Sequence, residues 1–541
     1  MSATMPPTLA ALLDAVSAEN ASSAAVIGPQ RIVSYAELAD ESRRLARGLE
    51  ELGVACGDRV AIWLPNIAAW PAMFFACARI GAIAVAVNTR FKGGELADIV
   101  RRSRAKVLVF WPGFRQIDFT GILAEIDPAA LDGIEHYVVY REDDSARPEH
   151  LHGRRVLDYH ELARCPPLVE ERASADSGCV MFTTSGTTRA PKFVLHRQAA
   201  LLEHARDIAS GLDLHAPDTV VYLAMPFCAA GGFSQLLPTF TLGRPLVTLP
   251  AFDAGQAAAL IQRHRATHSF LVGDMVASLL DAAPGARPFP SLRRCAFAAF
   301  TPSEAAIAIE AEARGIPLIG IYGSSELQAL YALQPLSLPV PARTQGGGRP
   351  LAATAAVRVR DPDSGRLLPP GVSGELEFIG PSRMVAYDDN AEASAAAFTD
   401  DGYFRSGDLG FIADDGRFIY QNRIGDVLRL AGFLVSPVEI EGFLKEHADV
   451  ADAQVVGVEI AGAPRAVAFV IPSDQSDTDA FDEAALLAHC RQRMANYKVP
   501  ARIFAIDAFP VTQSANGNKI QKNRLRDLAR ERVADNDRDI G

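Results

Sequence analysis

Residues 183–192 (TTSGTTRAPK) combine five hydroxyl side chains, one glycine and a lysine directly after the apolar run GCVMF. A loop of this composition can point backbone N–H groups and hydroxyls at phosphate oxygens, and Lys192 adds a positive charge. Ser/Thr-rich turns are also common as solvated loops, and the GxxxxGK[ST] spacing of a P-loop is absent here. The loop by itself is therefore only a weak indication of phosphate binding.

Seven further segments strengthen this interpretation because of their order along the chain. They are GDRVAIWLPN (57–66), VNTRFKGGEL (87–96), YGSSE (322–326), YFRSGDLG (403–410), NRIGDVLRLAGFLVSPVEIE (422–441), YKVP (497–500) and NGNKIQK (516–522). Together with the loop they resemble the adenylate-forming superfamily, which includes acyl-CoA synthetases, luciferases and peptide-synthetase adenylation domains. The likeness spans nearly the whole chain.

The resemblance implies that a carboxylate attacks the α-phosphorus of ATP, expels pyrophosphate and forms an acyl-adenylate. An anion attacks an anion in this step, so catalysis must come mainly from charge neutralisation and alignment. ATP, Mg²⁺ and coenzyme A are the implied cofactor and substrates, and coenzyme A would take the acyl group from the adenylate.

Roles for single residues follow from the same resemblance. Lys519 would lie between carboxylate and α-phosphate, and Glu326 with Thr187 would bind Mg²⁺ through hard oxygen ligands. Asp408 suits the two ribose hydroxyls because an ionised carboxylate only accepts hydrogen bonds, and Tyr322 would cover the adenine. The full nucleotide set is Thr184, Ser185, Gly186, Thr187, Thr188, Lys192, Ala299, Phe300, Tyr322, Gly323, Ser325, Asp408, Tyr420 and Arg423.

The implied second half-reaction needs the C-terminal domain to rotate, which withdraws Lys519 and admits coenzyme A. Gly432 would line the pantetheine tunnel, where a missing side chain permits close approach. Gly425 stands at the hinge position, where the family usually has Asp or Lys, and glycine can absorb large dihedral changes.

Several positions depart from the family pattern. Arg189 and Phe193 replace two glycines of the loop, and Arg189 restricts the backbone while it offers another phosphate donor. Asn518 is an extra residue before Lys519. We expect the acyl pocket to be lined by Phe227, Ala229, Gly232 and Ala298. None of these residues could meet a second carboxylate, so a hydrophobic acid, whether fatty, aryl or alicyclic, is favoured.

The elements that must position these residues alternate between strand and helix. Strands are expected at 59–65, 84–88 and 106–111 with helices near 67–79 and 93–104 between them, and similar units follow at 220–273 and 293–323. Ser34 and Glu37 form a capping box at the start of a helix that Gly53 ends. Such units require right-handed crossovers, so doubly wound parallel sheets are expected, with the nucleotide beyond the carboxyl ends of the strands.

The later part of the chain changes pattern. Short strands and turns between 345 and 425 predict a small antiparallel subdomain, and the remainder predicts a small mobile α+β domain. The predicted organisation is an α/β protein with an N-terminal AMP- and acyl-binding domain at 1–424 and a C-terminal domain with the catalytic lysine at 425–541.

Composition narrows the class of protein. A chain of 541 residues with 49% hydrophobic content can fill several cores. The net charge of −12 without a basic stripe argues against nucleic acid as a partner. Without a run of eighteen apolar residues, a signal peptide or paired cysteine spacings, we expect a cytoplasmic protein with no stable membrane insertion, disulfide framework or zinc site. The oligomeric state stays open, a homodimer included.

Two other functions are compatible with the sequence. The enzyme could deliver its acyl group to a carrier-protein thiol or another acceptor, although no carrier domain follows the last predicted helix. It could also be a weakly active nucleotide- or acyl-binding protein, since two loop glycines are replaced. The presence of Glu326, Asp408, Arg423 and Lys519 favours the active enzyme.

Overall fold

The computed structural model describes residues 6–142, 148–184, 191–298, 304–362, 364–424, 428–431, 433–435, 437–473, 481–514 and 517–539. Its contacts divide the chain into two compact units. The larger comprises Met1–Thr89, Leu96–Thr183 and Phe193–Asn422, and the smaller Arg90–Glu95, Thr184–Lys192 and Arg423–Gly541. The predicted domain boundary between residues 424 and 425 stays a prediction.

One sheet of the larger unit has nine strands in the order β20-β10-β9-β4-β3-β5-β6-β8-β7. Their bounds are β3 (Arg59–Trp63), β4 (Ile83–Ala86), β5 (Ala105–Phe110), β6 (His136–Val139), β7 (His150–Leu151), β8 (Arg154–Asp158), β9 (Gly178–Thr184), β10 (Lys192–Arg197) and β20 (Ala386–Tyr387). Helices α3 (Ala69–Ile80) and α4 (Gly93–Ser103) connect β3, β4 and β5, which pair in parallel. The predicted βαβαβ run is confirmed.

The second sheet has thirteen strands in the order β18-β19-β21-β22-β17-β16-β15-β14-β13-β11-β12-β1-β2. Their bounds are β1 (Ala24–Ile27), β2 (Ile32–Ser34), β11 (Val221–Leu223), β12 (Leu246–Thr248), β13 (His268–Val272), β14 (Arg294–Ala298), β15 (Leu318–Tyr322), β16 (Ala332–Leu333), β17 (Gly347–Pro350), β18 (Ala356–Arg360), β19 (Gly374–Ile379), β21 (Phe404–Ile412) and β22 (Phe418–Arg423). Strands β12, β11, β13, β14 and β15 pair in parallel. From β16 onward the pairing is antiparallel, so the predicted antiparallel part continues this sheet edge to edge.

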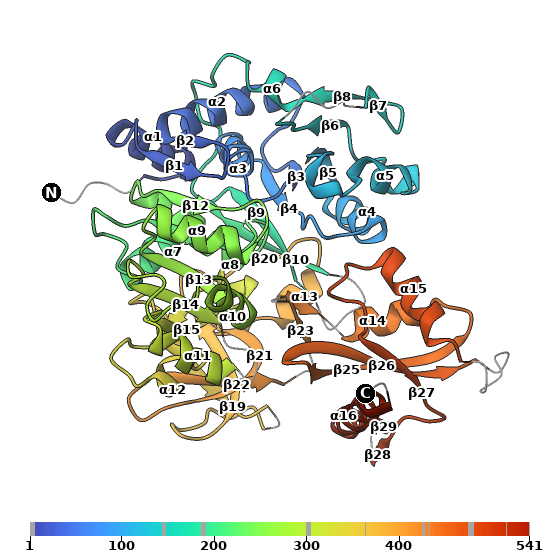
Figure 1. Ribbon diagram of the computed structural model, residues 1–541. Helices are drawn as coiled ribbons and strands as arrows, with labels where there is room; N and C mark the ends of the chain where they lie inside the picture. Colours follow the sequence, from blue (N-terminus) through green and yellow to red (C-terminus); the bar gives the residue numbers. More distant parts are fainter. Residues whose placement is uncertain are drawn as a thin grey trace. The chain divides into compact units, whose positions relative to one another are not determined.

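Helices cover both faces of the parallel strands, as Figure 1 shows. Phe270 and Val272 of β13 belong to a core shared with α7 (Gln198–Gly211) and α8 (Ala230–Thr241). Leu271 between them faces a second core shared with α9 (Ala254–Arg263), α10 (Gly273–Ala282) and α11 (Glu304–Ala313). Alternate side chains of a strand face opposite sides of the sheet. The apolar residues Phe270, Leu271 and Val272 are therefore buried on both faces, as expected for a doubly wound sheet.

Local sequence signals define the first helices. In α2 (Tyr35–Glu51) the hydroxyl of Ser34 accepts from the N–H of Glu37, whose carboxylate accepts from the N–H of Ser34. Gly53 follows the helix with φ +80°, a conformation that favours glycine. The predicted capping box is confirmed. The remaining helices of the larger unit are α1 (Leu9–Glu19), α5 (Phe119–Ala124), α6 (Tyr159–Leu162), α12 (Val340–Arg343), α13 (Ala391–Ala396) and the 3₁₀ turns η1 (Phe114–Gln116), η2 (Pro128–Leu131) and η3 (Ser325–Leu327).

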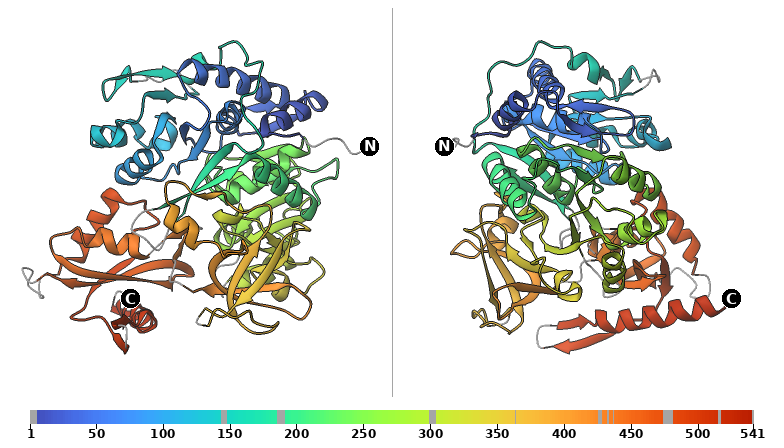
Figure 2. Two further views of the ribbon diagram at one scale, coloured as in Figure 1. Left: turned by 180° about the vertical axis from the view of Figure 1, so that it is seen from behind. Right: turned by 60° about the vertical axis from the view of Figure 1, so that its left-hand side comes forward.

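The smaller unit is α+β, as predicted. Its elements are β23 (Leu428–Leu430), β24 (Phe433–Val435), α14 (Pro437–Leu444), β25 (Val450–Ile460), β26 (Ala463–Pro472), α15 (Glu483–Arg493), β27 (Arg502–Ala505), β28 (Val511–Ser514), β29 (Gly517–Ile520) and α16 (Lys522–Asp539). Strands β25 and β26 form an antiparallel hairpin, and β27 joins β26 in parallel after the crossover through α15. Helices α14 and α15 cover one face of this sheet and α16 the other. Figure 2 shows α16 directly after the β28–β29 hairpin.

All seven cysteines are free thiols, and four of them are buried. Among the described residues, no helix has the length and apolarity that a membrane crossing needs.

Candidate active site

The predicted phosphate loop connects two neighbouring strands. Thr184 is the last residue of β9 and Lys192 the first of β10, and both are half-buried. The predicted Ser185, Gly186, Thr187 and Thr188 lie outside the described residues, together with Arg189. The sheet therefore holds the two ends of the loop at adjacent positions.

Phe193, one of the two departures from the family loop, is a core residue. It is 2% exposed, and the guanidinium of Arg102 lies 4.7 Å from its ring centroid. Its carbonyl accepts a 2.8 Å hydrogen bond from the N–H of Asp388. The large side chain therefore anchors the first residues of β10 where a glycine would have left the strand end freer to move.

The chain turns sharply after β15. A Cβ on Gly323 would overlap the carbonyl oxygen of Ala329, so only glycine fits there. Gln328 and Ala329 have left-handed backbone angles, with φ 57° and 62°. This turn returns the chain beside β15, where the N–H of Tyr331 donates to the carbonyl of Tyr322 at 2.9 Å.

Glu326 is a buried carboxylate within this turn. It is 7% exposed, and the hydroxyl of Tyr387 donates to its Oε1 at 2.9 Å. Ser325 beside it accepts a 2.8 Å hydrogen bond through its carbonyl from Nε2 of His196. Burial lowers the pKa of His196 to about 4, so its ring is neutral and donates through this nitrogen near pH 7. The orientation of Glu326 is thus determined by the packed interior around it.

Tyr322 and Asp408 come together although they lie 86 residues apart in the chain. The tyrosine hydroxyl donates to Asp408 Oδ2 at 2.6 Å, and both residues are buried. The Tyr322 ring stacks on Phe378 with centroids 4.8 Å apart, and the ring of Tyr420 lies 5.8 Å away. The N–H of Asp408 donates to the Ser406 hydroxyl at 3.0 Å. An aromatic surface beside an accepting carboxylate can bind a base and a ribose.

Three of the residues predicted for the acyl pocket lie at the start of α8. Phe227 is fully buried, with its ring centroid 5.7 Å from that of Trp70. Ala229 is the N-cap residue of α8 and is half-buried. A Cβ on Gly232 would overlap the carbonyl of Pro226, so close backbone packing accounts for this glycine.

The strand β14 ends at Ala298, the fourth predicted pocket residue, which is 8% exposed and pairs with Val272. Ala299 and Phe300 follow it and lie outside the described residues. Ala298 is thus placed at the carboxyl end of a parallel strand, the edge where α/β sheets bind their ligands.

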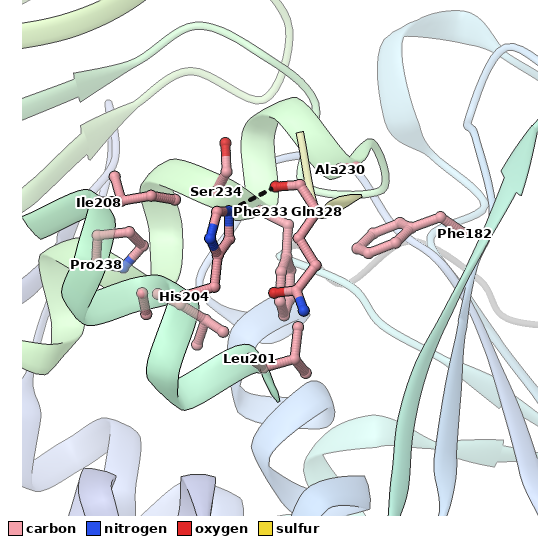
Figure 3. A pocket seen from close by; sticks show the side chains of 11 residues that line it. Phe182, Leu201, His204, Ile208, Ala230, Phe233, Ser234, Pro238 and Gln328 are labelled. Atoms are coloured by element: carbon pink, nitrogen blue, oxygen red, sulfur yellow. Dashed lines mark hydrogen bonds between the residues drawn. The ribbon is translucent and has the colours of Figure 1, made fainter. Parts of the chain in front are cut away.

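A pocket that sequence reasoning missed lies between α7 and α8 (Figure 3). Its walls are Phe182, Leu201, His204, Ala205, Ile208, Ala230, Phe233, Ser234, Leu237, Pro238 and Gln328. The four residues predicted for the acyl pocket are not among these described lining residues. Ala230, which lines the observed pocket, directly follows Ala229, which was predicted to line the acyl pocket. The two sets of residues are therefore adjacent in sequence at the start of α8.

His204, Ser234 and Gln328 are polar members of this pocket that sequence reasoning did not identify. Nε2 of His204 donates to the carbonyl of Gln328 at 3.2 Å, and burial lowers the His204 pKa to about 3. No spacing signal marks His204, whereas Gln328 could have been considered because it follows Glu326 by two positions. The histidine is therefore a neutral donor near pH 7.

The C-terminal predictions fall partly outside the described residues. Arg423 ends β22, and Lys519 lies in β29, where it pairs with Thr512 of β28. Their side chains are not described, and Gly425 and Gly432 lie outside the described residues. Their predicted roles stay predictions.

The candidate Mg²⁺ ligands are suited to an ion that binds together with a nucleotide. Among the described residues no group of three or more His, Cys, Asp or Glu side chains could hold a metal by itself. Mg²⁺ with ATP needs only one or two protein oxygens, because phosphates and water supply the other ligands. The buried carboxylate of Glu326 suits this requirement.

Known proteins are similar to this chain over most of its length. The model of the AMP-binding enzyme family matches residues 13–387, and that of the AMP-binding enzyme C-terminal domain matches residues 439–516. The indoleacetate–CoA ligase of Aromatoleum aromaticum is 30% identical, with 92% of this chain and 94% of that protein covered. A (methyl-dioxo-octahydroindenyl)propanoyl:CoA ligase of Mycobacterium tuberculosis is 31% identical, with 96% and 99% covered. The structure of the amide bond synthetase McbA from Marinactinospora thermotolerans superposes with a TM-score of 0.80 at 26% identity, covering 96% of this chain and 99% of that one.

Proposed function

This chain belongs to the family of AMP-binding enzymes, and we propose that it is an AMP-forming ligase that joins a hydrophobic carboxylic acid to coenzyme A. The acid and ATP give acyl-AMP and pyrophosphate, and the coenzyme A thiol then displaces AMP to give the thioester. The observation that supports it best is the buried Tyr322–Asp408 pair beside the turn that carries Glu326. That arrangement suits a nucleotide with its phosphates at the end of β15.

The protein's own groups would bind and align the two anions. Asp408 would accept from the ribose hydroxyls, and Thr184 and Lys192 would flank the β- and γ-phosphates. Bound Mg²⁺ would neutralise phosphate charge next to Glu326. Lys519 would place its ammonium between the carboxylate and the α-phosphate, where charge changes most during the attack.

Release of Lys519 after adenylation would require the C-terminal part of the chain to rotate at Gly425. Gly432 would then lie beside the pantetheine arm of coenzyme A, and Arg423 would contact the ribose or the α-phosphate. The glycine at the hinge supports this proposal, since it accepts wide changes in φ and ψ.

The apolar walls of the pocket in Figure 3 support a hydrophobic acid. Two of the similar ligases carry names of ring-bearing acids, indoleacetate and a methyl-dioxo-octahydroindenyl propanoate, and another is named for a fatty acid. We therefore propose a ring-bearing acid as the first substrate to test, followed by a straight-chain fatty acid.

A second function uses the same adenylate and another acceptor. The similarity to an amide bond synthetase over 99% of that chain supports an amine as the acceptor, because the name states that amide bonds are formed. In this alternative only the second half-reaction differs.

One experiment tests both functions. The protein is incubated with ATP, Mg²⁺ and a panel of fatty, aryl and alicyclic acids, with coenzyme A, with an amine, or with neither, and AMP and acyl products are followed by mass spectrometry. We expect AMP and a coenzyme A thioester. Acyl-adenylate without thioester would contradict the ligase, and amide formation would support the second function. No AMP from any acid would indicate a protein that only binds nucleotide or acyl groups.

We further propose that the enzyme works in the cytoplasm, and its oligomeric state stays open between a monomer and a homodimer. The membership in the AMP-binding enzyme family supports the location. Light scattering after size-exclusion chromatography measures the mass, and a monomer of 57.9 kDa would contradict the dimer.

A further inference from the structure

The apolar pocket of Figure 3 contains a buried amide that the protein itself does not satisfy. Gln328 is 4% exposed, and in the described part of the chain its Nε2 has no hydrogen-bond partner. Its amide group projects into the pocket between Phe182 and Leu201. Because buried N–H groups are almost always paired in native proteins, this one suggests that a ligand supplies the acceptor.

The backbone holds Gln328 in this position against its conformational preference. Two consecutive residues other than glycine, Gln328 and Ala329, have positive φ. The carbonyl of Gln328 is held by His204, and the N–H of Ala329 donates to the carbonyl of Ser324 at 2.6 Å. Such strained angles persist where surrounding contacts enforce them, and they cluster at ligand sites.

Gln328 lies close in sequence to Glu326, near which the reacting carboxylate of the substrate is proposed to bind. Gln328 follows Glu326 by two residues, and the opposite wall begins at Ala230, one residue after Ala229. An acid whose carboxylate lies near Glu326 would extend its body toward the amide. The other walls are mostly apolar, so the acceptor atom must belong to a largely hydrophobic molecule.

A second pocket adjoins the first. It shares Ile208, Ser234 and Pro238 with the first, and Gln235 is one of its walls. Oε1 of Gln235 is also buried without a partner among the described residues. Unsatisfied polar atoms thus occur in both pockets rather than at one position.

We infer that the acid carries a ketone, ether or hydroxyl oxygen on an otherwise hydrophobic body, and that Nε2 of Gln328 donates to this oxygen. The inference rests on the proposed function and specifies its substrate class. Gln328 is then a specificity-determining residue that selects oxygenated acids over plain hydrocarbons.

The test compares cyclohexylpropanoate with its ring ketones in the adenylation reaction, measured as kcat/KM for pyrophosphate release. In the wild-type protein we expect at least one ketone to be favoured over the hydrocarbon acid by about 10-fold or more, since a buried donor left unpaired penalises the wrong substrate. In Gln328→Met, which keeps the length and removes the N–H, the ratio should fall to about 1.

Gln334→Met is the matched control. Gln334 is equally buried and its Nε2 also lacks a partner among the described residues, but it does not line the pocket. Its ketone preference should match the wild type, and thermal unfolding of both variants confirms that they are folded. The inference is overturned if the hydrocarbon acid is preferred to every ketone, or if the preference for a ketone survives in Gln328→Met. These outcomes include the case in which a water molecule alone accepts from the amide. Pyrophosphate release from no acid at all would instead contradict the proposed function itself.

Discussion

Lys519 lies in a hairpin strand, and its predicted role belongs to one half-reaction only. We expect Lys519→Ala to slow acyl-AMP formation by about 100-fold or more, because it removes the charge between two reacting anions. Thioester formation from supplied acyl-AMP should be largely spared, since the lysine would be withdrawn in that step. Both rates are measured by product mass in single-turnover reactions.

The control is Lys522→Ala, three residues further on. Its ammonium lies 2.8 Å from Glu441, so this lysine is already engaged in an ion pair within the smaller unit. Adenylation should change little in this variant. An equal loss of both half-reactions in Lys519→Ala would contradict a two-conformation mechanism.

Glu326 tests the proposed metal position. Glu326→Gln keeps an acceptor for the Tyr387 hydroxyl and removes the negative charge, so we expect adenylation to fall roughly 100-fold and to require more Mg²⁺. Tyr387→Phe removes only the hydrogen bond and should stay within roughly 10-fold of wild type. The measurement is pyrophosphate release as a function of Mg²⁺ concentration. An unchanged Mg²⁺ dependence in Glu326→Gln would place the metal elsewhere.

At the scale of elements, strands β18 and β19 are joined by a buried ion-pair group. Glu377 is 0% exposed and accepts from Arg358 and Arg360, both at 2.6 Å. Glu377→Ala would leave two guanidinium groups without their shared partner, and we expect a loss of about 3–5 kcal/mol in the free energy of unfolding. Denaturant unfolding followed by fluorescence measures it.

The control for this prediction is Asp415→Ala. Asp415 pairs with Arg417 at 2.6 Å in a turn, and its side chain is 44% exposed. Water and salt screen the exposed carboxylate of Asp415, and the guanidinium of Arg417 keeps the Gln334 side chain as a partner, so the midpoint should move far less. Equal shifts for the two variants would show that Glu377 does not stabilise the paired strands.

At the scale of the whole molecule, buried histidines predict how stability depends on pH. Burial lowers the pKa to about 4 for His196, about 3 for His204 and about 4 for His268. Histidines of the unfolded chain titrate near 6.5, so between these values the unfolded chain binds more protons than the folded one. Stability from these groups is therefore complete above about pH 6.5 and declines as the pH falls toward 4.

The measurement is the thermal midpoint between pH 7 and pH 5, where most carboxylates are still ionised. We expect the midpoint to fall over this range. His268→Asn should reduce the slope, because one of the titrating groups is gone. A midpoint that is constant from pH 7 to pH 5 would contradict neutral buried histidines.

The sequence by itself determined the order of strands and helices and the family. Side-chain periodicity and capping residues act over a few positions, so the βαβαβ run and the Ser34–Glu37 cap could be read directly. The order of the family-like motifs along the chain identified Glu326 and Asp408 as candidate site residues. The sequence also indicated the doubly wound sheets, because crossover connections allow few alternatives.

Only the tertiary structure decided how these residues meet. Asp408 reaches Tyr322 because antiparallel strands extend the parallel sheet, and no local pattern specifies that pairing. The pocket between α7 and α8 was missed for the same reason, since His204 and Gln328 meet across 124 positions of chain. Such contacts depend on which distant surfaces pack together, whereas the sequence signals used here describe neighbours along the chain.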